Sequence, residues 1–240
     1  MQSGKTSRYF KYAIGEIILV VIGILIALQI NNWNEKRKDV EKQQKLFANL
    51  KIDFESRLIE LEELLAAKKQ AVTDSEALVE IINKQQSINP EEINRSLANT
   101  TNGFLFNEQF KMLDVLFYTG IINDIKNENL KRQLIEWPQK VEEMLEEQRV
   151  INGSLIDEYR RLISKYIPLR LINEEFVFRG YAIPKGKPVK QVPNYEGLFG
   201  DVEFENLLAE RELLLRILIL DNEELVKSAK EIIQLLDSEY

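Results

Sequence analysis

The feature that most constrains this chain is an apolar segment near its start, Tyr12–Ile30 (YAIGEIILVVIGILIALQI), which contains one charged residue, Glu16. As a helix this segment would be about 28 Å long, close to the ~30 Å hydrocarbon thickness of a bilayer. Aromatic residues flank it where rings favour the membrane interface: Tyr9, Phe10, Tyr12 and Trp33. The segment therefore predicts a single transmembrane helix in contact with the lipid bilayer, preceded by a basic tail over residues 1–11.

Two other interpretations compete with a membrane anchor: a cleaved signal peptide and a buried core helix. Signal peptidase requires small residues just before the cut, whereas bulky and polar residues, Gln29-Ile30-Asn31-Asn32, end this segment. We therefore predict that the anchor is retained.

The distribution of charge gives a weaker indication of orientation. Three basic residues precede the span and five follow it closely, so the Lys and Arg count alone does not favour a cytoplasmic N-terminus. However, a short basic tail is typical of a signal anchor, and long C-terminal domains translocate largely regardless of charge. Residues 39–240 are also acidic, with 26 basic and 37 acidic side chains. We predict a cytoplasmic-membrane protein with its N-terminus inside and its soluble domain in the periplasm.

Composition excludes several classes of function. The chain has no cysteine, which excludes disulfides, a thiolate nucleophile and cysteine-type zinc sites. It also has no histidine, the commonest general base and metal ligand. An acidic domain disfavours a nucleic-acid partner, which requires clustered Lys and Arg. We expect no enzyme activity, no cofactor and no nucleic-acid partner.

The anchor is predicted to continue as one helix to about Gln85, because no Pro or Gly lies between Gly23 and Pro90. Apolar residues recur there at spacings typical of one helical stripe: Phe47, Leu50, Phe54, Leu58, Leu61, Leu65, Val72, Val79 and Ile82. The stripe indicates either the core face of a bundle or a parallel coiled coil between protomers. The coiled coil is disfavoured because its register slips and charged residues interrupt it.

Further helices are predicted from capping signals. Asn89 and Pro90 begin a short helix that ends at residues 99–103, and residues 108–118 form another, ended by Gly120 in a left-handed conformation. Asn127 caps a longer helix from Glu128 to about Tyr166. Its apolar positions include Leu130, Leu134, Val141, Ile151, Leu155, Tyr159 and Leu162, and Pro138 predicts a kink near Trp137.

The last long helix is predicted over Val202–Asp237, with apolar positions at Leu207, Leu214, Ile217, Leu220, Leu225, Ile232 and Leu236. Before it, residues 167–200 form an irregular connector with a short extended segment over 176–183 and a basic loop. The lysines of this loop, Lys185, Lys187 and Lys190, are candidates for contact with an anion, or the loop is a solvated connector.

These elements predict an all-α fold in which an N-terminal transmembrane helix (residues 12–30) continues into an antiparallel, elongated helical bundle over residues 31–240.

One face of the anchor is a candidate helix–helix interface. At 100° per residue, Gly23 and Ala27 fall within about 20° of Glu16, and two small residues four apart let helices approach closely. An ionisable residue in a span is costly and marks a polar partner or an ion pathway. Alternatively, Glu16 lies about one turn from the start of the span and reaches the headgroups. The runs of acidic residues elsewhere are typical of solvated helix faces.

The segment KYAIGEIILVVIGILIALQINNWNEKRK (residues 11–38) resembles the N-terminal signature of an uncharacterised family of single-span proteins abundant in the Bacteroidota. The segments FYTGII (117–122) and IKNENL (125–130) are similar to phrases in the same family. The resemblance implies a cell-envelope membrane protein and brings no activity or catalytic residue. The position of Glu16 also resembles the glutamate of type IV pilins, but Lys11 stands where pilin processing needs a small residue.

The sequence therefore favours a structural or interaction protein that acts through helix packing, as a homo-oligomer or with a membrane-protein partner. One alternative is a sensory module that binds a ligand between its helices, which a large apolar pocket would support. Another is a subunit of an ion-driven membrane complex that uses Glu16.

Overall fold

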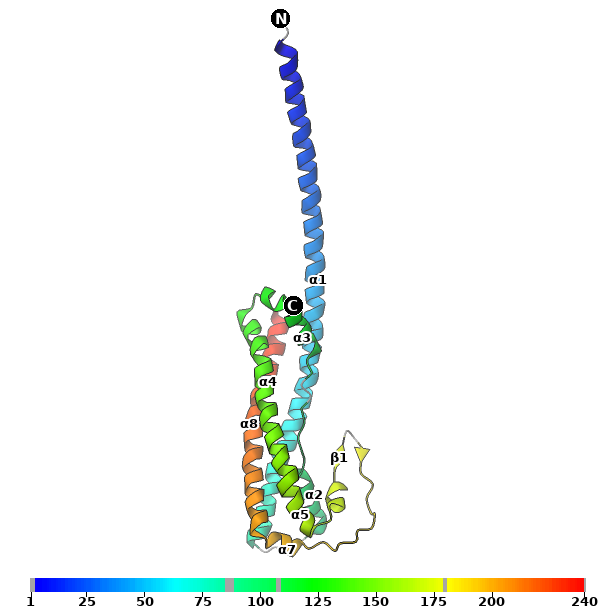
Figure 1. Ribbon diagram of the computed structural model, residues 1–240, viewed down its shortest axis with the longest axis vertical. Helices are drawn as coiled ribbons and strands as arrows, with labels where there is room; N and C mark the ends of the chain where they lie inside the picture. The colour runs from blue at the N-terminus through cyan, green and yellow to red at the C-terminus, as the bar shows by residue number, and fades with distance from the viewer. Residues whose placement is uncertain (1–2, 85–88, 107–108, 179–180, 240) are drawn as a thin grey trace.

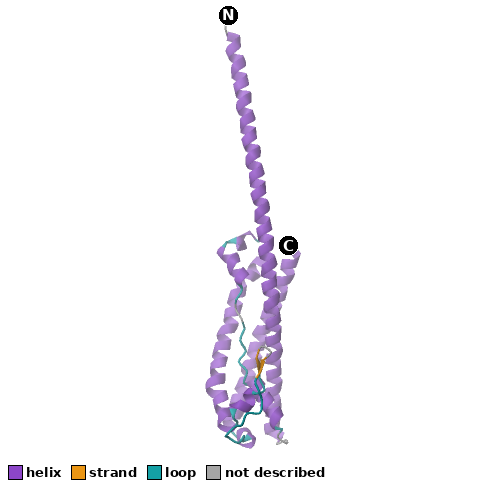
Figure 2. Cartoon of the chain, turned by 90° about the vertical axis from the view of Figure 1, so that its right-hand side faces the viewer, coloured by secondary structure: helices purple, strands orange, loops and turns teal. Residues whose placement is uncertain are grey.

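The computed structural model describes residues 3–84, 89–106, 109–178 and 181–239, and the side chains of 14–83, 89–106, 109–177 and 182–238. It is organised on one helix, α1 (Ser3–Lys84). At 1.5 Å per residue α1 is about 120 Å long. Its N-terminal part projects alone beyond the rest of the molecule, as Figures 1 and 2 show. The prediction of one continuous helix from the anchor to about residue 85 is confirmed.

The C-terminal half of α1 packs in an elongated antiparallel bundle with α4 (Glu128–Ser154) and α8 (Val202–Glu239). The last residues of α8 and the short helix α3 (Lys111–Tyr118) lie where α1 emerges from the bundle, and other connecting elements lie toward the opposite end (Figure 1). The all-α fold and the elongated antiparallel arrangement agree with the sequence.

The predicted caps of the shorter elements are also present. The Asn89 side chain accepts a hydrogen bond from the Glu91 amide at the start of α2 (Pro90–Thr100). After α3 (Lys111–Tyr118), Gly120 adopts φ +75° and leads into the short turn η1 (Ile121–Asp124). The Asn127 side chain accepts from two backbone amides of α4. The predicted start of α3 at Glu108 lies outside the described residues.

α4 runs as one α-helix through Pro138, and the predicted kink near Trp137 stays a prediction. Trp137, the residue before this proline, is buried, and its ring lies edge-to-face against Phe54 and Phe110. The irregular turn lies further on, in the π-helical segment η2 (Leu155–Tyr159), which joins α4 to α5 (Arg160–Tyr166). One irregular helical path thus covers the whole span predicted from Glu128 to Tyr166.

The predicted irregular connector contains small elements. It begins with α6 (Leu169–Asn173), and an antiparallel hairpin of β1 (Val177–Phe178) and β2 (Tyr181–Ala182) follows, with Val177 opposite Ala182. After the basic loop, α7 (Tyr195–Phe199) precedes α8.

Buried residues form two large apolar clusters, one at each end of the bundle. The cluster nearer the anchor includes Phe47, Phe54, Trp137 and Ile232, and the cluster at the far end includes Leu78, Leu97, Ile163 and Phe204. A smaller group around Val72 and Leu215 lies between them. The predicted stripe on α1 supplies residues to all three.

The face of α8 was predicted correctly only in its second half. Leu225, Ile232 and Leu236 are buried as expected. In the first half Leu208, Leu215 and Leu218 are buried, whereas the predicted Ile217 and Leu220 are 37% and 66% exposed, and Leu207 and Leu214 are partly exposed. Apolar residues surround α8 between 213 and 220, so their spacing alone does not identify the buried face.

We predict that Leu218→Ala lowers the free energy of unfolding by about 2–5 kcal/mol, because it leaves a cavity in the core. Leu220→Ala on the exposed face should change it by less than about 0.5 kcal/mol. Urea unfolding of the full chain in detergent, followed by circular dichroism, measures both. A larger loss for Leu220→Ala would contradict the buried face described above.

Candidate functional site

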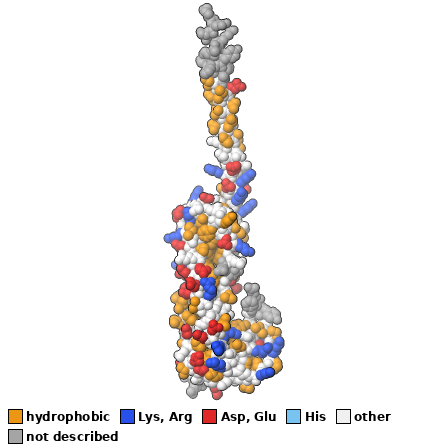
Figure 3. All heavy atoms as spheres, in the orientation of Figure 1, with side chains coloured by type: hydrophobic (Ala, Val, Ile, Leu, Met, Phe, Trp, Pro, Cys, Tyr) orange, Lys and Arg blue, Asp and Glu red, His pale blue; other side chains and the backbone are white. Residues whose placement is uncertain are grey.

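The predicted anchor is exposed along its whole described length. All side chains from Ile14 to Trp33 are exposed, and Figure 3 shows this part as a band of hydrophobic side chains above the bundle. By length and composition, one helix in the described residues is apolar enough to cross a membrane, and it lies near the N-terminus.

The structure places Glu16, Gly23 and Ala27 on this isolated part of α1. A Cβ atom added to Gly23 would meet nothing within 4 Å, so no other part of the described chain covers this face. The predicted interface anchor Trp33 is 66% exposed, and the Arg37 guanidinium lies 5.7 Å from its ring centroid. The side chains of Tyr9, Phe10 and Tyr12 lie outside the described residues.

A polar neck separates the apolar segment from the bundle. It runs from Asn31 to Lys45, about 22 Å of helix, and the first buried side chain after it is Phe47. Polar contacts join neighbouring turns of the neck: Asn31 donates to Glu35 at 3.1 Å and Arg37 donates to Asn34 at 3.2 Å. Both contacts lie within α1 itself.

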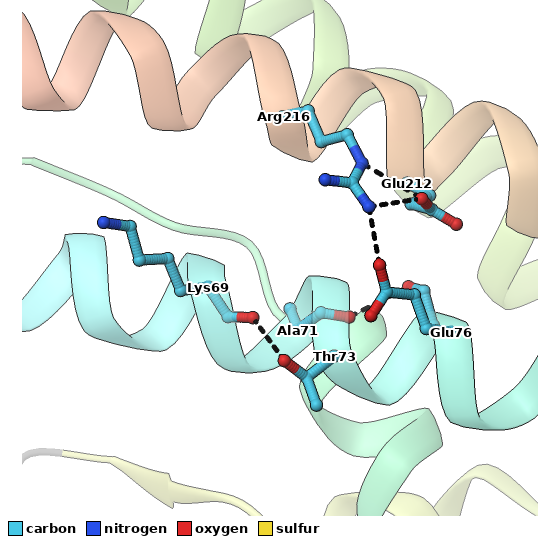
Figure 4. A network of polar contacts seen from close by, with 7 residues as sticks. Lys69, Ala71, Thr73, Glu76, Glu212 and Arg216 are labelled. Carbon is cyan, nitrogen blue, oxygen red and sulfur yellow. Dashed lines mark hydrogen bonds and ion pairs between the residues drawn. The ribbon is translucent and has the colours of Figure 1, made fainter.

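Inside the bundle, ion pairs join α1 and α8, and three of them are spaced by seven residues on each helix. The pairs are Glu62 with Lys230 at 2.7 Å, Lys69 with Glu223 at 2.6 Å, and Glu76 with Arg216 at 2.7 Å. Figure 4 shows the last pair, in which Glu212 also accepts from Arg216. The sign of the charge alternates along each helix.

This alternation specifies the register of the two helices. Sliding α8 by one heptad in either direction would place acid against acid and base against base at these positions, for example Glu62 against Glu223. Each exposed pair contributes little by itself. Like-charge pairs would be unfavourable, however, so the pattern disfavours the two nearest alternative registers.

The buried contact surface between α1 and α8, here called the seam, contains a lysine. On α1, residues at a strict spacing of seven are Phe47, Phe54, Leu61, Lys68 and Ser75, all at most 2% exposed. The ammonium of Lys68 donates to the Asn222 side chain of α8 at 2.8 Å, and the Asn222 amide donates to the Leu61 carbonyl at 2.8 Å. Ser75 donates to the Ala71 carbonyl within α1.

Burial lowers the pKa of Lys68 to about 8, and the nearby Asp221 carboxylate opposes this change. On the α4 side, a hydrogen bond with the Asp221 carboxyl raises the pKa of Glu147. Lys68 is 1% exposed, so it cannot meet a substrate in this conformation. Its physical role is to link α1 and α8 at one position.

A second buried cation holds the end of α2. The Arg211 guanidinium of α8 donates to the Thr100 carbonyl at 2.9 Å and the Asn102 carbonyl at 2.6 Å. Burial lowers the pKa of Arg211 to about 10 and raises that of the neighbouring Tyr159 to about 12. Arg211 thus satisfies carbonyls that the end of a helix leaves without partners.

The basic loop lies at the end of the bundle farthest from the anchor. Lys185 makes an ion pair with Glu175 at 2.6 Å, whereas Lys187 and Lys190 are exposed. An anion contact by the three lysines stays a prediction. Beneath the loop lies a cleft of about 540 Å³, bordered by α2, α6 and the start of α7.

The side of the bundle has another hollow, of about 290 Å³, lined by Leu105, Phe106, Gln109 and residues of α4. Gln148 lines it and is 2% exposed, and neither polar atom of its amide has a hydrogen-bond partner in the described part of the chain.

The structure does not gather the sequence-predicted residues into one site. Glu16, Gly23 and Ala27 share a face of the anchor, and the three lysines lie at the opposite end of the molecule. Within the described ranges, no three Asp or Glu residues are placed to hold a metal ion. The sequence interpretation missed Lys68, Arg211 and Asn222, although a seven-residue spacing from Phe47 passes through Lys68.

Comparison with known proteins gives one result. The model of a family of unknown function, DUF6090, matches residues 16–104, which cover most of α1, all of α2 and the first residues after it. The matched part therefore contains most of the anchor, the neck and Lys68, and this part of the chain is similar to that family. No curated protein and no solved structure matches the chain.

We predict that the double variant Lys68→Met, Asn222→Leu is more stable than the natural chain at pH 7 by about 1–3 kcal/mol, because an apolar pair replaces a buried charge. In the natural chain Lys68 binds its proton more weakly when folded, with a pKa of about 8 against 10.5 when unfolded. The unfolded state therefore binds more protons between these values, and natural-chain stability rises with pH across this window.

The advantage of the double variant should consequently shrink as the pH rises from 8 to 10. Urea unfolding at a series of pH values measures the difference, and Lys69→Met, at the neighbouring exposed position, is the control. If the free energies of unfolding of the natural chain and of the double variant change with pH in parallel, the lowered pKa of Lys68 in the folded state is contradicted.

Proposed function

We propose that this chain is a single-span protein of a bacterial cytoplasmic membrane that acts by helix packing and without catalysis. It holds a rigid helical domain at the membrane surface and associates, as a homo-oligomer or with another membrane protein, through its anchor. The observation that supports the proposal best is the course of α1, which leaves the bundle as a bare helix.

The exposed anchor is the first support. Between Ile14 and Ile30 twelve large apolar side chains are exposed. Exposure of each of these side chains to water instead of an apolar environment costs about 1.5–3 kcal/mol of free energy, and insertion into a lipid bilayer removes that cost. The polar neck then begins at Asn31 and lies at the expected depth of the headgroups.

The filled interior of the bundle is the second support. Where a ligand-binding sensory module would need an apolar cavity, the seam between α1 and α8 holds close-packed side chains such as Leu50, Leu61 and Leu225, all at most 1% exposed. Lys68 in that seam already has its hydrogen-bond partner. This packing suits a rigid scaffold.

In this proposal the N-terminus is cytoplasmic and the bundle is periplasmic, at the end of a stiff helix. Similarity of residues 16–104 to a family of unknown function agrees with a shared anchor and neck but names no activity. The bundle would then present its far end about 80 Å from the bilayer, by the length of α1 after Ile30.

We predict that Gly23→Leu with Ala27→Leu weakens self-association or partner binding by about tenfold or more, a loss of about 1.4 kcal/mol, because bulky side chains keep the helices apart. Leu25→Phe, which adds bulk to the opposite face, is the matched control. Light scattering after size-exclusion chromatography measures homo-oligomers in mild detergent, and co-purification measures other membrane partners. If the Gly23→Leu, Ala27→Leu variant and the Leu25→Phe control associate equally well, this face of the anchor does not mediate association.

A further inference from the structure

We propose that the cleft at the far end of the bundle binds an organic cation, an ammonium or guanidinium group on a short aliphatic stem. Binding of the cation is independent of the proposed function, whereas the exclusion of lipid as its source rests on the proposed membrane anchor. The carboxylate of Glu174 at the end of α6 carries it.

Glu174 is a buried acid with an unused acceptor. Its side chain is 8% exposed, and its Oε2 atom accepts a hydrogen bond from the Gly186 amide at 3.1 Å. Gly186 has φ +83°, which glycine adopts without strain and which turns the loop so that its amide reaches Glu174. The Oε1 atom is buried and has no hydrogen-bond partner among the described residues. A carboxylate oxygen in such a place favours a cationic donor.

The charge around the cleft has the sign that a cation requires. Three carboxylates line it, those of Glu91, Glu174 and Glu175, against the single ammonium of Lys185. That ammonium is already paired with Glu175 at 2.6 Å, so it does not neutralise Glu174. An anionic ligand would be repelled here.

The remaining walls suit an aliphatic stem. Leu171, Pro90 and Pro193 line the cleft together with the ring of Tyr195, whose hydroxyl donates to the Asn94 side chain at 3.0 Å. A volume of about 540 Å³ lies within the range of small-molecule sites. The Tyr195 hydroxyl and the Asn94 side-chain oxygen are thus paired with each other, whereas Oε1 of Glu174 has no partner among the described residues.

The position of the cleft excludes lipid as the source of the cation. The helices α2 and α7 that border it lie at the end of the bundle remote from the anchor (Figure 1), about 80 Å of helix beyond Ile30. The cation is therefore either a free amine or a basic side chain of another protein. Both present the same chemistry to Glu174.

Titration calorimetry of the full chain in detergent tests this proposal with n-pentylamine as the probe. The amine should bind at millimolar concentration or below, and neutral n-pentanol should not. Glu174→Gln keeps the side-chain size and an acceptor for the Gly186 amide but removes the charge, so it should weaken amine binding about tenfold or more. Glu174→Asp, which retains the charge with a shorter side chain, should bind at an intermediate level.

The matched control is Glu196→Gln, an exposed position on α7 outside the cleft with the same change in net charge. It should bind the amine as the natural chain does. N-acetyl-lysine methylamide distinguishes the two sources, since comparable binding of this probe indicates a protein side chain and binding of pentylamine alone indicates a free amine.

Three results would overturn the proposal: no amine binding to the natural chain, equal binding of amine and alcohol, or equal loss in Glu174→Gln and Glu196→Gln. Circular dichroism of each variant separates loss of binding from loss of fold.

Discussion

The packing of α1 against α8 determines the rest of this structure. The two helices meet along buried positions spaced by seven, and at one such position on each helix a polar pair joins them, Lys68 on α1 and Asn222 on α8. In the next registers Lys68 would face Leu215 or Ala229 and would be buried without a partner, which is strongly unfavourable. Together with the alternating ion pairs outside the seam, this contact selects one antiparallel register.

That register connects the two ends of the molecule. Because α1 has no break between the apolar segment and Lys84, the seam with α8 fixes the direction in which the anchor leaves the bundle. Arg211 extends the same seam to the far end, where it holds the carbonyls at the end of α2. The cleft around Glu174 is built on α2, α6 and α7, so its walls are positioned relative to the anchor by these packed helices.

The sequence was sufficient for the fold and insufficient for the polar interior. The capping residues Asn89 and Asn127 and the absence of Pro and Gly in α1 are local signals, and they predicted the elements well. The prediction of the buried face failed in the first half of α8 because apolar residues surround the helix there, and no signal in the sequence indicated that Arg211 and Asn222 are buried. Glu174 could not be found either, since its burial depends on a loop twelve residues later that closes over it.

The central claim is that α1 runs without a hinge from the anchor through the neck into the bundle. A distance measured across the neck tests this claim most directly. The chain has no cysteine, so nitroxide labels on Lys38→Cys and Ala66→Cys, both exposed, can be placed without background. Double electron–electron resonance in lipid nanodiscs should give one narrow distribution of distances between the two labels, centred near 42 Å. This value follows from a rise of about 1.5 Å per residue along α1. A broad distribution or a clearly shorter distance would show a hinge in the neck and contradict the account.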